Sequence, residues 1–125
     1  VTLCPEDKRQ PKVSCGRNWN TDLLVFKDGN HDGKFNGNDR VLERINALDT
    51  KGNLKWRSFR NRQFLTMTPK GYTNYQNGNF TYCSENRDPR MSRQIIINVQ
   101  GRARLTHYKN EAGHRIDRKG KPLRC

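Results

Sequence analysis

The chain lacks several features that would place it in a common functional class. No apolar run approaches the roughly 18 residues that a membrane-spanning helix needs, and the N-terminus lacks the basic and apolar parts of a signal peptide. Sequence motifs of phosphate-binding loops, dinucleotide-binding folds, serine hydrolases and zinc proteases are also absent. Hydrophobic residues make up only 31% of the 125 residues, and the mean hydropathy is −1.13. Apolar burial alone would therefore hold the fold weakly against chain entropy.

Four cysteines can supply the missing stabilisation. The chain has no C-x-x-C pair, and zinc and iron–sulfur sites prefer such close spacing, so the sequence predicts two disulfides made in an oxidising compartment. Three connectivities are possible. We favour Cys4–Cys15, because both lie in one short Pro-containing loop, and Cys83–Cys125, because it would fasten the chain end. A secreted protein must have been exported, so we expect this chain to be a mature or truncated form.

The positive charge is unevenly distributed. Residues 1–50 hold eight Lys/Arg and eight Asp/Glu, which cancel, whereas residues 51–100 hold nine against two and residues 101–125 hold eight against two. The whole excess of +13 therefore falls in the second part of the chain. A charge needed only for solubility has no reason to avoid the first 50 residues, so this polarity favours a surface that binds nucleic acid or another polyanion.

Short runs rich in β-branched and aromatic residues alternate with Gly, Pro, Asn and Asp, which is the pattern of strands and turns. The run 40–48 also suits a helix face, but the hairpin context before it favours a strand. The sequence predicts an all-β or α+β fold in a single domain, residues 1–125. The other expected strands are residues 1–4, 22–26, 63–67, 79–83 and 94–99.

Two further segments carry structural expectations. Asn77-Gly78 is the strongest short hairpin signal in the chain, and it predicts that residues 72–75 pair with residues 79–82. Residues 101–125, called the C-terminal segment below, combine glycine and charge with little apolar content. We expect this segment to form a basic loop or a loose hairpin that Cys125 ties down.

Residues 28–39 resemble a calcium-binding loop, with oxygen-bearing side chains at alternate positions and Gly33 at the sharp turn. The last position holds Asp instead of the usual Glu, and a short β-like run precedes the loop where a helix should stand. Asp, Asn and Gly are equally typical of a long hairpin turn. We therefore favour a turn and expect no metal and no cofactor. The weak candidates for calcium ligands are Asp28, Asn30, Asp32 and Asp39.

The three histidines do not form a convincing catalytic group. A small basic disulfide protein could be a nuclease that uses His107 and His114 as acid and base. Both lie in a polar segment in which nothing would orient them or tune their pKa values. We expect no enzymatic activity.

The run Gly101–Arg104 (GRAR) follows the best predicted strand. In a strand, alternate side chains share a face, so Arg102 and Arg104 would point the same way, about 6.6 Å apart. Each guanidinium can fork onto phosphate oxygens, and Gly101 lets the backbone bend or approach a neighbour closely. The sequence predicts a polyanion site here. The C-terminal segment adds Lys109, Arg115, Arg118, Lys119, Lys121 and Arg124.

Several motifs together resemble the soluble domain of the GspH/FimT family of minor pilins and pseudopilins, over nearly the whole chain. They are LCP…C, W…LLVF.D.N.DG, FLTMTPKG…NGNFTYC, R.IIINVQGRARL and the final PLRC. The resemblance implies an α+β pilin-like fold whose sheets pack on a long N-terminal helix. In this chain it implies two packed, mostly antiparallel sheets without that helix, its leader or its membrane-embedded part. It also implies that the start of the 28–39 loop is a hairpin turn.

Within that family, the GRAR element resembles that of the FimT-type minor pilins, which are implicated in binding DNA during uptake by naturally competent bacteria. Gly101, Arg102 and Arg104 match that motif, while the other cations of the C-terminal segment match only in charge. Thr106 stands where a third arginine would continue the row.

The resemblance implies a minor pilin of a type IV pilus that binds extracellular double-stranded DNA nonspecifically, through its phosphate backbone, for natural transformation. The implied partners are DNA, other pilins and, through the missing helix, the bacterial inner membrane; the implied location is the inner membrane, the periplasm and the extracellular pilus. Two alternatives remain on the same fold. One is a structural minor pilin, and the other is a type II secretion pseudopilin that primes filament assembly. In both, the basic face would dock an acidic protein neighbour.

Overall fold

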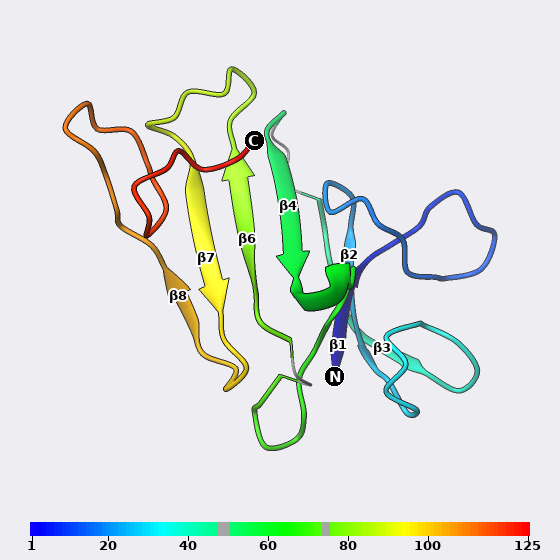
Figure 1. Cartoon of the computed structure of the whole chain (residues 1–125). Helices are drawn as coiled ribbons and strands as arrows, with labels where there is room; N and C mark the ends of the chain where they lie inside the picture. Colours follow the sequence, from blue (N-terminus) through cyan, green and yellow to red (C-terminus); the bar gives the residue numbers. More distant parts are fainter. Residues whose placement is uncertain (48–50, 74–75) are drawn as a thin grey trace.

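The computed structural model describes residues 1–47, 51–73 and 76–125, which form two four-stranded antiparallel sheets (Figure 1). The first sheet has the order β3-β2-β1-β5 and the second has the order β4-β6-β7-β8. The first consists of β1 (Thr2–Pro5), β2 (Leu23–Lys27), β3 (Arg40–Ile45) and β5 (Leu65–Thr66). The second consists of β4 (Asn53–Ser58), β6 (Gly78–Cys83), β7 (Arg93–Ile97) and β8 (Ala103–Leu105).

Helical structure is limited, within the described residues, to the 3₁₀ turn η1 (Phe59–Asn61). Nothing in that part of the chain is a helix long and apolar enough to cross a membrane. The predicted antiparallel β architecture in two sheets is confirmed.

The first sheet buries alternate residues of its central strands. Leu24 and Phe26 of β2 are fully buried, and Cys4 of β1 lies opposite Leu24 in the register. The Phe26 ring packs edge-on against Phe35, which belongs to the loop before β3, with 5.3 Å between the ring centres. These residues form a small core on one side of the sheet, as expected when alternate side chains of a strand share a face.

A second core, built around two tryptophans, joins the sheets. Trp56 of β4 packs against Phe80 of β6 at 4.5 Å between ring centres, and Trp19 packs edge-on against Phe80 at 5.2 Å. Each buried indole finds a hydrogen-bond acceptor, because Trp19 Nε1 donates to Gln63 Oε1 and Trp56 Nε1 donates to the carbonyl of Arg62. Leu65 of β5 and Ile97 of β7 complete this core.

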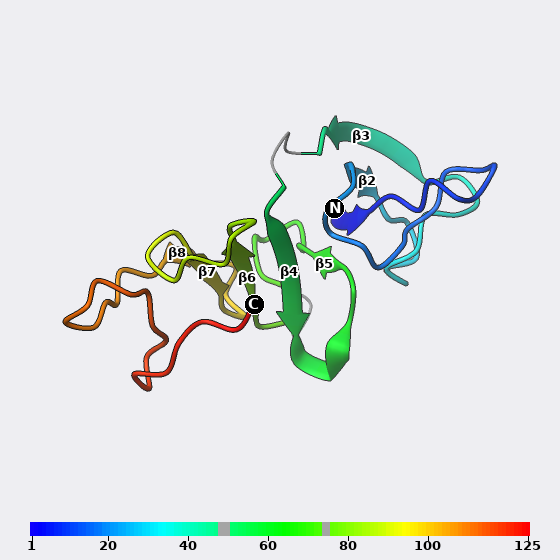
Figure 2. The ribbon, with the colours of Figure 1, turned by 90° about the horizontal axis from the view of Figure 1, so that it is seen from above.

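The second sheet therefore has an inner face, which carries Trp56 and Phe80, and an outer face. The register places Arg57 opposite Asn79, Asn79 opposite Ile96, and Ile96 opposite Arg104. These four residues alternate with the core residues and so define the outer face. Figure 2 shows the C-terminal segment on the side of this sheet that points away from the first sheet.

Most strands predicted from the sequence are present, including 40–45 of the ambiguous 40–48 run. The predicted hairpin between residues 72–75 and 79–82 is wrong, because β4 and β7 occupy both edges of β6. Neither Asn77 nor Gly78 has the positive φ that a type I′ turn requires. A Cβ on Gly78 would instead collide with the Arg57 carbonyl and the Trp56 ring. Residues 74–75 lie outside the described part of the chain.

Candidate nucleic-acid interface

A short hairpin joins β7 to β8 and carries the GRAR element. The Gly101 N–H donates to the Asn98 carbonyl (3.0 Å), and the Asn98 N–H donates to the Arg102 carbonyl (3.1 Å). The Asn98 side chain adds a third link, because its Oδ1 accepts from the Arg102 N–H at 3.0 Å. Gly101 has φ +78°, the left-handed conformation that a G1-type bulge needs. The backbone on the N-terminal side of Arg102 is thus fixed by local hydrogen bonds.

Gly101 is also required by a contact with another loop. A Cβ at this position would overlap the carbonyl oxygen of Gly71 and would press on the Met67 side chain. The Gly71 turn is itself closed by a hydrogen bond from its N–H to the Thr68 carbonyl (2.9 Å). The hairpin therefore rests on the 68–71 turn, and a close backbone approach of the kind that glycine allows occurs here, within the protein.

Arg102 and Arg104 leave this hairpin on the outer face of the second sheet. Both residues are exposed, and Arg104 lies opposite Ile96 on β7. Within the described residues neither guanidinium makes a hydrogen bond or an ion pair, and together they line one hollow of the surface. The two arginines share a face, as the strand alternation predicted.

The C-terminal segment folds into two successive tight turns. In the first turn, the Gly113 N–H donates a hydrogen bond to the Asn110 carbonyl. The backbones of Lys109 and Arg115 form an isolated antiparallel β-bridge across this turn. The second is closed by an N–H bond from Gly120 to the Asp117 carbonyl. The segment that composition predicted as a basic loop or a loose hairpin thus consists of two consecutive turns.

One carboxylate organises the second turn. Asp117 Oδ1 accepts the backbone N–H groups of Lys119 (2.8 Å) and Lys121 (2.9 Å). These backbone hydrogen bonds, that from Lys121 first, together with the positive charges of both lysines, lower the pKa of Asp117 below its usual value. The charged carboxylate thus holds a turn from which three exposed cations project, namely Arg118, Lys119 and Lys121.

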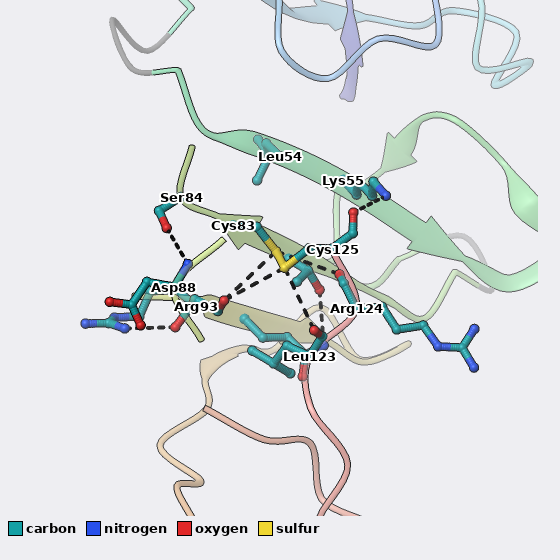
Figure 3. The surroundings of a disulfide bond; sticks show 12 residues. Leu54, Lys55, Cys83, Ser84, Asp88, Arg93, Leu123, Arg124 and Cys125 are labelled. Atoms are coloured by element: carbon teal, nitrogen blue, oxygen red, sulfur yellow. Dashed lines mark hydrogen bonds between the residues drawn. A yellow bond between two sulfur atoms is a disulfide. The ribbon is translucent and has the colours of Figure 1, made fainter. Parts of the chain in front are cut away.

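The disulfide Cys83–Cys125 fixes the end of this segment to β6 (Figure 3). Lys55 of β4 adds a hydrogen bond from its Nζ to the main-chain oxygen of Cys125 at 2.7 Å. The other disulfide, Cys4–Cys15, closes the loop between β1 and β2. Both pairings are the ones that we favoured from the sequence.

The structure brings some predicted site residues together and separates others. Arg118 lines the same hollow as Arg102 and Arg104, and it also lines an adjacent hollow with Lys119 and Lys121. Lys109 and Arg115 line neither hollow, and Arg115 is half-buried, with an Nε that has no partner among the described residues.

Sequence reasoning missed one cation of this surface. Arg57 on β4 lines both hollows although it lies more than 40 residues before the GRAR element. The alternation of Lys55, Trp56 and Arg57 was the available signal, since it is typical of a strand with one buried and one cationic face. The strand was missed because only two of its six residues, Leu54 and Trp56, are apolar.

The acidic 28–39 loop uses its carboxylates to close turns. Asp28 Oδ2 accepts the Gly33 N–H (2.8 Å), Asp39 Oδ1 accepts the Gly29 N–H (3.1 Å), and Asp32 Oδ1 accepts the Lys34 N–H (2.9 Å). Hydrogen bonds, the largest from the Asn36 side chain, lower the pKa of Asp32. Among residues 1–47, 51–73 and 76–125, no three His, Cys, Asp or Glu side chains converge as a metal site would require.

The sequence matches a known protein family, and the fold matches a solved structure. The family model described as type II transport protein GspH matches residues 1–101. The chain belongs to the GspH family. Membership places the chain among proteins of type II transport.

A solved structure resembles this GspH-family domain as a whole. It is the type IV minor pilin FimU of Pseudomonas aeruginosa, with a TM-score of 0.55 at 16% sequence identity, covering 85% of this chain and 72% of that one. At this identity the similarity concerns the fold. No curated protein matches the domain in sequence. The family match ends at Gly101, so the arginines and the C-terminal segment lie beyond it.

Proposed function

We propose that this domain is a minor pilin that binds double-stranded DNA through its phosphate backbone, without sequence preference, for uptake in natural transformation. The observation that carries the proposal is the pair Arg102 and Arg104. Both are exposed, follow a hydrogen-bonded hairpin and share one face of a sheet, with no acidic partner among the described residues.

An arginine pair on a rigid hairpin has the geometry to bind phosphate. Guanidinium donates two parallel N–H bonds to neighbouring phosphate oxygens, and neutralising each phosphate releases condensed counterions. A single basic face contacts few phosphates, so binding should be weak, with a dissociation constant of roughly 10⁻⁶ to 10⁻⁴ M at physiological salt.

Duplex DNA is the favoured form. Proteins that bind single strands without sequence preference stack bases on aromatic side chains. Tyr108 is the only aromatic residue of the C-terminal segment, and Phe59 is the only aromatic residue that lines the hollow of Arg102 and Arg104, so the site lacks a row of rings on which successive bases could stack. A site of this composition recognises the backbone of DNA and leaves the bases unread.

Replacing Arg102 and Arg104 together by Gln tests the proposal. We expect weaker binding to duplexes of every sequence, and a plot of log affinity against log salt whose slope is shallower by about 1.8, which corresponds to two phosphate contacts. Fluorescence anisotropy with labelled duplexes at several salt concentrations measures both quantities. A double variant that kept the affinity and the slope of the parent would contradict this site.

A second candidate, a structural minor pilin or pseudopilin that primes filament assembly, is favoured by the inner face of the same sheet. Ile95 and Leu105 lie opposite each other there and are 39% and 44% exposed. An apolar pair of this kind suits packing against another pilin, and the arginines would then dock an acidic neighbour. Salt-dependent DNA binding by the isolated domain separates the two functions, as does pilus assembly in cells that lack the protein.

A further inference from the structure

The outer face of the second sheet has a cation at each end of one row of residues. The register runs from Arg57 on β4 through Asn79 on β6 and Ile96 on β7 to Arg104 on β8. Adjacent strands lie about 4.8 Å apart, so the two arginine backbones stand roughly 14 Å from each other across the sheet. Their side chains rise from the same face on opposite sides of a polar and apolar floor.

Two hollows of the surface meet along this row. One, of about 730 Å³, extends toward the β7–β8 turn and includes Arg102, whereas the other, of about 370 Å³, extends under the C-terminal segment. They have four lining residues in common and so adjoin each other along the strands; the two hollows together are called the groove below. The residues in common are Arg57, Asn79, Ile96 and Arg118.

The groove is strongly cationic. Asp117 is its only carboxylate among the lining residues, and its Oδ1 is already engaged by two backbone N–H groups. The side chains of Arg57 and Arg118 make no hydrogen bond or ion pair with any described residue. The lining cations are Arg57, Arg102, Arg104, Arg118, Lys119, Lys121 and Arg124.

The floor offers a neutral donor between the two arginine walls. Asn79 Oδ1 accepts a hydrogen bond from Thr81 Oγ1 at 3.1 Å, which fixes the amide so that its NH₂ group remains available. Amide donors of this kind contact phosphate and sugar oxygens in protein–DNA interfaces. The groove thus combines walls that attract a phosphodiester backbone with a floor that can hydrogen-bond to it.

We infer that one strand of the DNA lies along this groove, with its phosphates between Arg104 on β8 and Arg57 on β4. Arg57 and Arg118 are then DNA contacts in addition to the hairpin arginines. The inference rests on the proposed function and specifies the path of the ligand. From the level of Asn98 to that of Gln94 the groove spans roughly 13 Å, so it can hold only a short stretch of one strand.

Replacing Arg57 by Gln tests this path, with Arg40→Gln as the matched control. Arg40 is an exposed arginine at the start of β3 in the first sheet, so its loss changes the net charge equally but lies outside the groove. We expect Arg57→Gln to weaken duplex binding about eightfold at about 0.1 M salt and to make the salt slope shallower by about 0.9. Arg40→Gln should change neither quantity appreciably. Near-UV circular dichroism, which reports on the Trp19–Trp56 core, verifies that each variant is folded.

The outcomes separate the groove from the proposed function. If Arg57→Gln binds like the parent while the Arg102/Arg104 double variant loses affinity, the path is wrong and DNA binding by the hairpin stands. If Arg40→Gln weakens binding as much as Arg57→Gln does, net charge alone explains the effect and the groove is overturned. If the parent domain binds no duplex even at low salt, both the groove and the proposed function fail.

Discussion

Residues 1–50, which supply β1 to β3, and residues 51–125, which supply β4 to β8, use their cations differently. In the first region Lys8, Arg9 and Arg44 each pair with a carboxylate, at 2.6 to 3.1 Å. In the described part of the second region, the ion pair is Arg90–Asp88 at 3.1 Å. Among the described residues, the first region therefore pairs three of its eight cations with carboxylates, whereas the second region pairs one of its 17.

The difference follows from how few acids the second region has. It contains 17 Lys/Arg and four Asp/Glu, so most of its cations have no carboxylate to meet. Exposed ion pairs contribute only about 0 to 1 kcal/mol each, so their absence costs little stability. Mutual repulsion among the cations remains, and the Cys83–Cys125 disulfide and the Asp117 turn hold them in place against it. Charge can thus accumulate where covalent and backbone bonds, instead of ion pairs, maintain the structure.

Removing the disulfides should produce the largest difference in stability and DNA affinity between the two regions. Replacing Cys83 and Cys125 by Ser should lower the free energy of unfolding by about 4 kcal/mol, because this disulfide closes the longer loop of the two. The C-terminal segment would lose its anchor, so DNA affinity should also fall. Denaturant unfolding and anisotropy measure the two effects.

The matched control removes the disulfide of the first region. Replacing Cys4 and Cys15 by Ser should cost about 3 kcal/mol while leaving DNA affinity unchanged at temperatures where the domain stays folded. Equal loss of affinity in both double variants would mean that the two regions are not functionally distinct.

Two glycines of the second region, Gly101 and Gly113, should differ in how much their replacement by Ala destabilises the domain. Gly101→Ala should destabilise the domain by about 2 to 4 kcal/mol and displace Arg102, because a Cβ there has both a positive φ and a collision with Gly71. Gly113→Ala carries the same positive φ but meets no atom within 4 Å, so it should cost only about 1 to 2 kcal/mol. Thermal unfolding of both variants checks the order. Equal destabilisation would show that the contact with the 68–71 turn is unimportant.

The smallest expected difference between the two regions concerns the pKa values of their carboxylates. Hydrogen bonds from Arg9 and from Lys8 are the largest causes that lower the pKa values of Asp7 and Asp22, whereas a backbone hydrogen bond from Lys121 is the largest cause for Asp117. All three carboxylates therefore contribute stability that is fully present above the unfolded pKa of about 3.9 and is lost as the pH falls through the lower folded pKa.

Salt screens interactions with cationic side chains more than it affects a local backbone hydrogen bond. Raising the ionic strength should therefore move the pKa values of Asp7 and Asp22 upward more than that of Asp117, as measured from carboxyl carbon shifts by NMR. In the Asp117→Asn variant, the amide shifts of Lys119 and Lys121 should no longer respond to acid. Equal salt sensitivity at all three carboxylates would contradict the assigned causes.

Local pattern predicted much of the fold. Runs rich in β-branched and aromatic residues predicted the strands that contain Leu24 and Ile97, and chain position favoured both disulfide pairs. Strand β4 was not predicted because charged residues flank Trp56. The hairpin predicted at Asn77-Gly78 was wrong because Gly78 allows close packing within a sheet and does not form a turn. Both errors have one origin: which partner a strand or a glycine meets is a long-range property that a short window of sequence does not contain.

The sequence by itself determined that this domain carries an excess of cations in its second part, that alternate residues of 102–104 share a face, and that disulfides supplement a small core. These are properties of composition, spacing and strand geometry. Only the tertiary structure decided that Arg57 stands across the sheet from Arg104 and that Arg118 lies between the two hollows. The order β4-β6-β7-β8 is fixed by hydrogen bonds between residues far apart in the chain, and a charged surface forms where that order brings distant side chains together.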